Sequence, residues 1–226
     1  MSEKAHYLGH RKRLRERFAK TGADGLADYE LIELLLFSAL PHSDAKPLAK
    51  RLCDRFGSVG AIMAAEPRAL GEVEGAGDAV IHTLKLAEAV SLRTLRDHVV
   101  ERPVIATWNS LLDYCKAKLA HQMNEQFNVL FLDNNNSLIA DETQQRGTVN
   151  HVPLYPREVI KRALELHASA IILVHNHPSG DPTPSSADIE MTEEVCQAGQ
   201  KLGIAVHDHL IFSRTGHSSF KSLGLL

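Results

Sequence analysis

The chain has few cysteines and no long run of apolar residues. Cys53, Cys115 and Cys196 are far apart and form no Cys-x-x-Cys, which argues against a disulfide scaffold and a zinc deaminase, and favours a reducing compartment. No apolar run approaches the roughly 18 residues that a membrane span needs. Residues 1–13 contain no apolar signal region. We therefore expect a soluble, cytoplasmic protein with no membrane partner.

Neither positive nor negative charge is in large excess over the chain as a whole. The 226 residues carry a net charge of −3, which argues against a general polyanion binder, and the length suits one large or two small domains. The first 20 residues are an exception, with seven basic side chains against two acidic ones: Lys4, Arg11, Lys12, Arg13, Arg15, Arg17 and Lys20, against Glu3 and Glu16. Such a basic helix either contacts phosphates or forms a solvated face, and we favour the solvated face.

The first hundred residues predict a helical domain. Leu48, Leu52 and Phe56 recur at i, i+4 and i+8, and Gly57 is placed to end their helix. Asp28 and Glu30 near the start of another apolar stretch favour a helix start there. The other predicted helices cover residues 31–36, 58–65 and 70–89.

Gly75-Ala76-Gly77 lies inside the predicted stretch 70–89, between two helical segments, and resembles the turn of a helix-hairpin-helix element. In such an element the glycines expose backbone N–H groups to a DNA phosphate. Glu74 and Asp78 flank the turn, and their carboxylates oppose anion binding. Both interpretations stay open: phosphate binding at Gly75 and Gly77, or a tight interhelical turn with a packing role only.

The helical pattern breaks at residues 97–103, which places a domain boundary between a region 1–100 and a region 104–226. In the second region, helices and strands alternate, which predicts an α/β (α+β) fold with a mixed sheet flanked by helices. We expect helices at residues 108–120, 157–166 and 185–202. We expect strands at 127–132, from 137 onward, at 170–174 and 204–206, and at 211–213 to close the sheet.

The most informative pattern is His175-x-His177 directly after the apolar run 170–174, followed after seven intervening residues by Ser185-x-x-Asp188. Two His at i and i+2 leaving a strand project the same way. Asp188 follows in the first turn of a predicted helix. Two imidazoles and one carboxylate leave a fourth position for water, which is the arrangement of a catalytic zinc site.

Plainer interpretations exist for each part of this pattern. Ser185-x-x-Asp188 is also a helix capping box, and a lone His-x-His is most often a surface pair. His207 and His209 form a rival pair at i and i+2.

The motif His175-Asn176-His177-Pro178 with Ser185 and Asp188 resembles the JAMM motif of MPN-domain metalloproteases. The longer segment from His175 to Asp181 resembles the corresponding sequence of the RadC family of bacterial proteins. Residues 147–150, 156–158 and 208–209 also look like RadC positions. Because His209 resembles a family position and His207 does not, we interpret His209 as a packing residue or one that orients a metal ligand, and His207 as incidental. The resemblance covers residues 104 to 226 closely, and residues 8–95 resemble the family's helical N-terminal domain more loosely.

The resemblance implies an MPN/JAMM domain with a cytidine-deaminase-like architecture and Zn²⁺ held by His175, His177 and Asp188. It implies hydrolysis of a protein or peptide substrate at a peptide or isopeptide-like amide. Glu125, just before the strand 127–132, matches the family's general base, and Ser185 matches the donor to the oxyanion. Glu142 and Glu158 are weaker candidates for the base. The family name also brings a link to DNA repair, with DNA contact through the N-terminal domain.

Two alternatives stay open. In the first, the protein is a non-catalytic DNA-associated protein whose metal is structural or vestigial. In the second, it is a scaffold that docks partners on an MPN surface. We interpret Arg157 as part of a salt bridge rather than a substrate ligand. Nothing in the sequence indicates the oligomeric state.

Overall fold

A computed structural model describes residues 3–100, 103–146 and 154–226. The chain divides into two compact units, residues 1–90 and 91–226. The segment 147–150, which contributed to the family resemblance, lies outside the described residues. The two units are described in turn.

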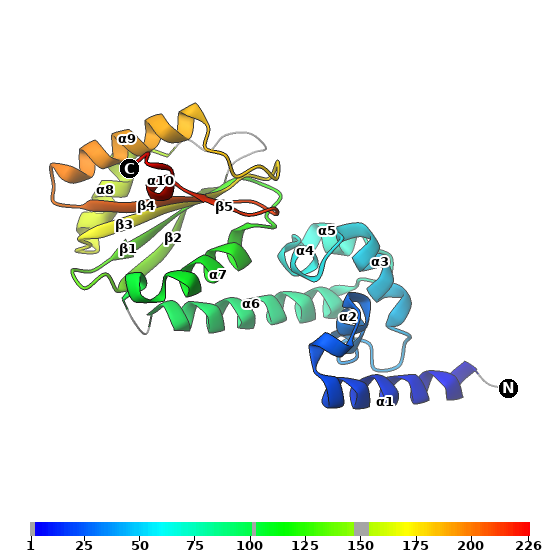
Figure 1. Cartoon of the computed structure of the whole chain (residues 1–226). Helices are drawn as coiled ribbons and strands as arrows, with labels where there is room; N and C mark the ends of the chain where they lie inside the picture. The colour runs from blue at the N-terminus through cyan, green and yellow to red at the C-terminus, as the bar shows by residue number, and fades with distance from the viewer. Residues whose placement is uncertain (1–2, 101–102, 147–153) are drawn as a thin grey trace. The chain divides into compact units, whose positions relative to one another are not determined.

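The first unit is helical, as the sequence predicts (Figure 1). Gly57 ends α3 with φ of +83°, a conformation that glycine adopts without steric cost. Ser58 caps α4 by accepting a hydrogen bond from the Ala61 N–H. Leu36, Leu48 and Leu52 belong to one fully apolar core. The described elements are α1 (Glu3–Thr21), η1 (Ala23–Gly25), α2 (Asp28–Leu36), α3 (Lys46–Phe56), α4 (Val59–Ala64), α5 (Pro67–Gly71) and the start of α6 (Asp78–Val100).

The glycine turn joins α5 to α6. Gly75 has φ of +89°, which only glycine adopts easily. The Arg51 guanidinium donates two hydrogen bonds to the Glu74 carbonyl, at 2.8 and 3.1 Å, and the Ala76 side chain is buried in the core. These contacts give the turn a packing role. Gly77 has open space around the position of a Cβ.

Two of the arginines in α1 are committed to contacts within this unit. Arg11 is buried and donates hydrogen bonds to the carbonyls of Leu40, Pro41 and Ser43. Arg17 forms an ion pair with Glu30. The net positive charge that α1 presents to solvent is therefore smaller than the sequence count suggests.

The second unit is a three-layer α/β structure. Its sheet has the order β2-β1-β3-β4-β5, with β3 and β4 parallel and the other neighbours antiparallel. The strands are β1 (Gln126–Leu132), β2 (Leu138–Arg146), β3 (Ala170–Asn176), β4 (Ala205–Phe212) and β5 (His217–Ser219). The helical elements are η2 (Val104–Thr107), α7 (Trp108–Leu119), α8 (Pro156–Glu165), α9 (Ser186–Gln200) and α10 (Phe220–Leu223).

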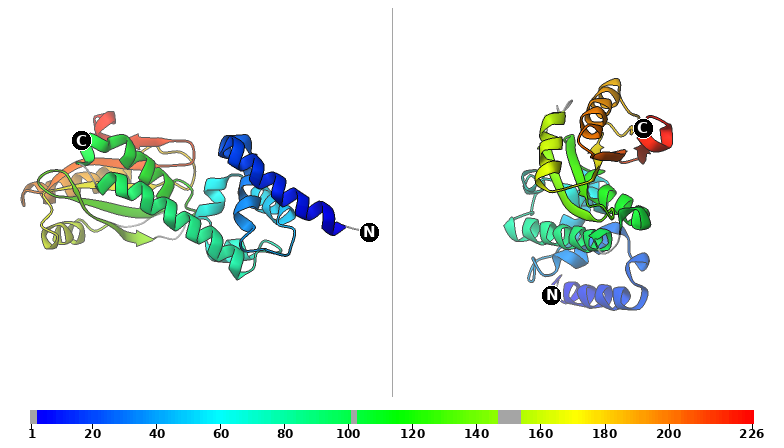
Figure 2. Two further views of the ribbon diagram at one scale, coloured as in Figure 1. Left: turned by 90° about the horizontal axis from the view of Figure 1, so that it is seen from below. Right: turned by 90° about the vertical axis from the view of Figure 1, so that its left-hand side faces the viewer.

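Helices cover both faces of this sheet (Figures 1 and 2). Alternation along each strand decides which side chains face which layer. Phe127, Val129 and Leu173 share a core with side chains of α8 and α9. Leu130 and Val174 point to the other face and share a core with α7. A central strand buried on both faces explains the unbroken apolar run that precedes the motif.

Two predicted elements were wrong in extent. The strands predicted at 204–206 and 211–213 fall on a single strand, since β4 runs from Ala205 to Phe212. The polar residues at 207–209 obscured the strand. Asp208 and His209 pair with β3 in the interior of the sheet rather than forming a loop, and the pairing shifts in register at His207. The strand that closes the sheet is β5.

The helix predicted to end near residue 89 also continues further, because α6 reaches Val100. Asp97 and His98 are compatible with an exposed helical face. Leu95 and Val99 pack in the core of the second unit. The last turns of α6 thus belong to that unit, although the sequence alone suggested a break there.

Candidate metal centre

Three side chains of the His-x-His and Ser-x-x-Asp patterns meet at the carboxyl end of β3. His175 is the penultimate residue of β3 and is 0% exposed, and His177 follows just after the strand. Asp188 lies in the first turn of α9. The loop between them returns the chain so that the start of α9 faces the end of β3. Crevices at the carboxyl ends of strands are common ligand sites in α/β folds.

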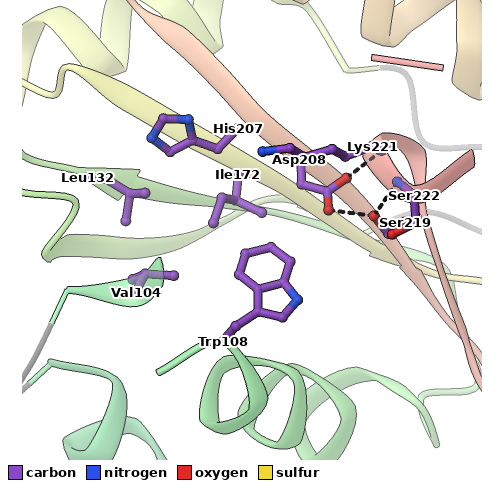
Figure 3. A pocket seen from close by; sticks show the side chains of 9 residues that line it. All are labelled: Val104, Trp108, Leu132, Ile172, His207, Asp208, Ser219, Lys221 and Ser222. Atoms are coloured by element: carbon purple, nitrogen blue, oxygen red, sulfur yellow. Dashed lines mark hydrogen bonds between the residues drawn. The ribbon is translucent and has the colours of Figure 1, made fainter. Parts of the chain in front are cut away.

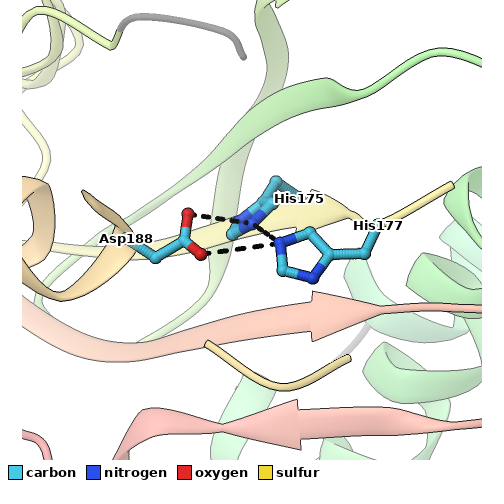
Figure 4. A group of neighbouring side chains, drawn as sticks. All are labelled: His175, His177 and Asp188. Atoms are coloured by element: carbon cyan, nitrogen blue, oxygen red, sulfur yellow. Dashed lines mark hydrogen bonds and ion pairs between the residues drawn. The ribbon is translucent and has the colours of Figure 1, made fainter. Parts of the chain in front are cut away.

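The ligand atoms of these side chains point toward one another (Figure 4). His175 Nε2 lies 3.0 Å from His177 Nε2 and 3.3 Å from Asp188 Oδ1, and His177 Nε2 lies 3.5 Å from Asp188 Oδ2. Tetrahedral ligands of a zinc ion are separated by about 3.3 Å, given Zn–N distances of roughly 2.0–2.1 Å. The three residues therefore fit a divalent metal ion, and the sequence identified all of them.

The second nitrogen of each imidazole is also engaged. His177 Nδ1 donates to the Asp181 carbonyl at 2.9 Å, because a carbonyl can only accept. His175 Nδ1 lies 2.8 Å from His209 Nε2. Such partners fix the orientation of a metal-binding imidazole and leave the lone pair of its other nitrogen free for the metal.

The site favours positive charge. Burial alone would raise the pKa of Asp188, but hydrogen bonds from His175, His177 and Ser185 hold that pKa well below its usual range. The hydrogen bond to Asp188 is the main cause that raises the pKa of His177, with smaller contributions from the Asp181 carbonyl and the charge of Glu125. Burial opposes that rise. The same negative field would stabilise a bound cation.

Comparison with known proteins agrees with this geometry. Residues 105–225 match the family described as RadC-like JAB domain, and residues 6–81 match the UPF0758 N-terminal family. The chain belongs to the RadC-like JAB domain family. A UPF0758 protein from Rhodobacter capsulatus is 59% identical over 213 residues, which cover 94% of this chain and 100% of that relative.

Ser185 caps α9 in this RadC-like chain. Its hydroxyl accepts from the Asp188 N–H at 3.2 Å, and Asp188 Oδ2 accepts from the Ser185 hydroxyl at 2.6 Å and from the Ser185 N–H at 2.7 Å. Both halves of the predicted capping box are thus present. The bonds also hold the Asp188 carboxylate in place. Ser185 is solvent-exposed, so its hydroxyl is accessible from outside the cluster.

Glu125 lies directly before β1 and is half-buried. Phe127 pairs with His175 in the antiparallel ladder, so continuing the register by two residues brings Glu125 opposite His177. This nearness agrees with the influence of Glu125 on the pKa of His177. The other candidate bases differ: Glu142 is paired with Arg162, and Glu158 with Arg157.

Asn176, the middle residue of the His-x-His pattern, was not predicted to have a role. Its side chain is 1% exposed and points away from the two histidines. Asn176 Oδ1 accepts from the Gln126 N–H at 2.8 Å, and Nδ2 donates to the carbonyls of Gln122 and Asn124 at 3.3 and 3.1 Å. The amide therefore holds the backbone on both sides of Glu125.

A hollow lies on the α7 face of the sheet, opposite the metal cluster, because Leu132 and Ile172 line it. Figure 3 shows its lining side chains. Its volume is about 330 Å³, and Trp108, His207 and Lys221 are among its lining residues. Asp208 also faces this hollow, but its carboxylate is occupied by hydrogen bonds within the fold. His207 bonds to Asn136 and lies outside the metal cluster, as the sequence interpretation expected.

Gly75 and Gly77 belong to the first unit and have no part in the metal cluster. Arg157 is exposed and forms an ion pair with the neighbouring Glu158, which agrees with the salt-bridge interpretation. Within the described ranges, no helix is both long and apolar enough to cross a bilayer.

Proposed function

We propose that the RadC-like JAB domain is a zinc-dependent hydrolase that cleaves a peptide or isopeptide-like amide in a protein or peptide substrate. The observation that supports this proposal is the convergence of His175, His177 and Asp188, with both remaining imidazole nitrogens engaged by hydrogen-bond partners. Three protein ligands leave a coordination position open, as catalytic zinc sites do.

A bound Zn²⁺ ion would lower the pKa of a coordinated water to about 7 and polarise the substrate carbonyl. Glu125 acts as the general base: its carboxylate accepts a proton from the attacking water and passes it to the leaving amine nitrogen. The hydrogen bonds from Asn176 to the backbone of Asn124 and Gln126 support this role, because they hold the segment that carries Glu125.

Ser185 donates a hydrogen bond to the oxyanion that develops on the substrate carbonyl. Its exposure beside Asp188 supports this assignment. The hydroxyl proton now bonds to Asp188 Oδ2, so it must exchange that acceptor for the oxyanion during the reaction. A donor of this kind typically contributes about 3 kcal/mol of transition-state stabilisation.

The test compares the zinc-loaded wild type with Glu125→Gln, using metal analysis and digestion of a peptide library that includes isopeptide-linked peptides. We expect one zinc per chain in both proteins, and a loss of at least about 100-fold in hydrolysis for the variant. Glu158→Gln is the matched control, since Glu158 is an exposed carboxylate paired with a neighbouring arginine. It should retain full activity.

Three results would overturn the proposal. Hydrolysis by Glu125→Gln at the wild-type rate would remove Glu125 from the mechanism. Absence of cleavage by the zinc-loaded wild type would favour a non-catalytic role for the metal site. Metal content that is unchanged by His177→Ala would remove His177 from the metal ligands.

A further inference from the structure

We infer that His209 and Thr192 are positioning residues that fix the orientation and the protonated nitrogen of the metal ligand His175, and tie it to the backbone of Asp188. This inference rests on the proposed metal site. His175 Nδ1 lies 2.8 Å from His209 Nε2, and His209 Nδ1 lies 2.7 Å from Thr192 Oγ1. The Thr192 hydroxyl donates to the Asp188 carbonyl at 2.5 Å.

The two ends of this chain of hydrogen bonds decide the direction of every bond in it. The last acceptor is a carbonyl, so the Thr192 hydroxyl must be the donor there. Its oxygen then accepts from the N–H at His209 Nδ1, which leaves a lone pair on His209 Nε2. That lone pair accepts from His175 Nδ1–H. The lone pair of His175 is then on Nε2, the atom that faces His177 and Asp188.

Solvent offers no replacement for these partners. His175 and His209 are 0% exposed and Thr192 is 1% exposed. The rings of Phe127 and Phe220 lie beside His209, with centroids 5.5 and 4.4 Å away. Without His209, the Nδ1–H of His175 would be buried without an acceptor, or the imidazole would turn and lose its alignment with the cluster.

The chain of bonds joins three separate elements. His175 is on β3, His209 is on the neighbouring parallel strand β4, and Thr192 is one turn after Asp188 on α9. The ligand His175 on β3 and the ligand Asp188 on α9 are therefore connected through groups that do not contact the metal. Partners of this kind typically change metal affinity by about 10–100-fold when removed.

The test measures the apparent dissociation constant for Zn²⁺ in competition with a chromogenic chelator, together with the visible spectrum of the Co²⁺-loaded protein. His209→Phe keeps an aromatic ring among Phe127 and Phe220 but removes the acceptor. His209→Gln restores an acceptor near the position of Nε2. Thr192→Val removes only the hydroxyl. His207→Phe, two residues away on β4 and bonded to Asn136, is the matched control.

We expect Zn²⁺ affinity to fall about 10–100-fold in His209→Phe, to recover largely in His209→Gln, and to fall less in Thr192→Val. The His207→Phe control should bind like the wild type. The Co²⁺ spectrum should change in His209→Phe and not in the control. Nitrogen-15 NMR of the zinc-loaded wild type should show the protons of His175 and His209 on Nδ1.

Unchanged Zn²⁺ affinity in His209→Phe, or a proton on Nε2 of His209 in the zinc-loaded wild type, would overturn the inference while leaving the metal site intact. A wild type that binds no Zn²⁺ would instead reject the metal site, and this inference with it. If His209→Phe does not fold, the Zn²⁺ affinity of Thr192→Val becomes the test. An affinity equal to that of the wild type would then overturn the inference.

Discussion

The ring of Phe127 stacks on the imidazole of His175, with centroids 5.3 Å apart and an interplanar angle of 13°. The contact follows from strand register, because Phe127 on β1 is paired with His175 on β3. Phe127 thus restrains the plane of a proposed metal ligand.

Phe127→Leu should weaken metal binding. We expect a several-fold loss of Zn²⁺ affinity and a fall of about 1–2 kcal/mol in the free energy of unfolding, because the shorter side chain leaves space beside His175. Phe131→Leu is the control, since Phe131 lies in the same core and pairs with Ile171, away from the site. It should lose similar stability and keep its affinity. Equal losses of affinity in both variants would contradict a specific role for the stacking.

Ser185→Ala should separate helix capping from chemistry. Loss of the cap should lower the free energy of unfolding by about 1 kcal/mol, and loss of the oxyanion donor should lower kcat by about 10²–10³-fold. Ser58→Ala is the comparison, because Ser58 caps α4 in the first unit through the same kind of bond. Denaturant unfolding and peptide cleavage would measure the two effects. A kcat for Ser185→Ala equal to that of Ser58→Ala would leave Ser185 as a cap only.

Asp208 anchors the C-terminal helix α10. Its buried carboxylate accepts from the N–H groups of His209 and Lys221 and from the Ser219 hydroxyl, at 2.8, 3.0 and 2.6 Å. Asp208→Asn replaces one acceptor oxygen with a donor, so we expect a loss of about 1–3 kcal/mol in unfolding free energy. Amide exchange at Lys221 and Ser222 should become faster.

The control for Asp208→Asn is Asp133→Asn. Asp133 accepts from two backbone N–H groups in a hairpin turn, where asparagine serves equally well. Its unfolding free energy should change little. A comparably large loss in both variants would argue against a special role for the buried carboxylate of Asp208.

Glu33 should make the first unit sensitive to pH. Its carboxyl is almost fully buried, and burial raises its pKa, although the hydrogen bond with His10 opposes the rise. The folded state therefore binds the proton more tightly than the unfolded state, whose pKa is about 4.3. Stability from this group is present in full below that value and is lost as pH rises through the higher folded pKa.

Glu33→Gln removes this titration and keeps an acceptor for His10. We expect the variant to gain stability relative to wild type as pH rises from about 4 to 7. Urea unfolding of the full chain, combined with amide exchange in α2, would measure the difference. If the difference in unfolding free energy between the wild type and Glu33→Gln is constant with pH, the burial of Glu33 has no effect on the pH dependence of stability.

Local sequence signals were enough to place the metal ligands. The apolar run ending at Val174 fixes a buried strand, alternation brings His175 and His177 to related positions, and the capping box fixes the start of α9 three residues before Asp188. Each of these signals acts over a few residues. The helix end at Gly57 was predictable for the same reason, since it depends on one residue in the left-handed region.

The partners of the ligands were less accessible to sequence reasoning. In the sequence, Thr192 has no feature that distinguishes it from other helical residues, and Phe127 is one of several apolar residues in a predicted strand. Their relation to His175 depends on strand register and on how α9 packs on the sheet, which are contacts between distant parts of the chain. His209 could be singled out only by the family likeness. The length of β4 was obscured because polar residues in a buried strand look like a loop.

The carboxyl end of β3 contacts two parts of the proposed site. On one side of the strand, His175 and His177 would bind the cation. On the other side, the Asn176 side chain hydrogen-bonds to the backbone of the segment that carries Glu125. A displacement of that terminus would move Glu125 and a bound ion together, so the distance between them should vary less than the position of either. This linkage should preserve the proposed catalytic geometry during thermal motion of the surrounding loops.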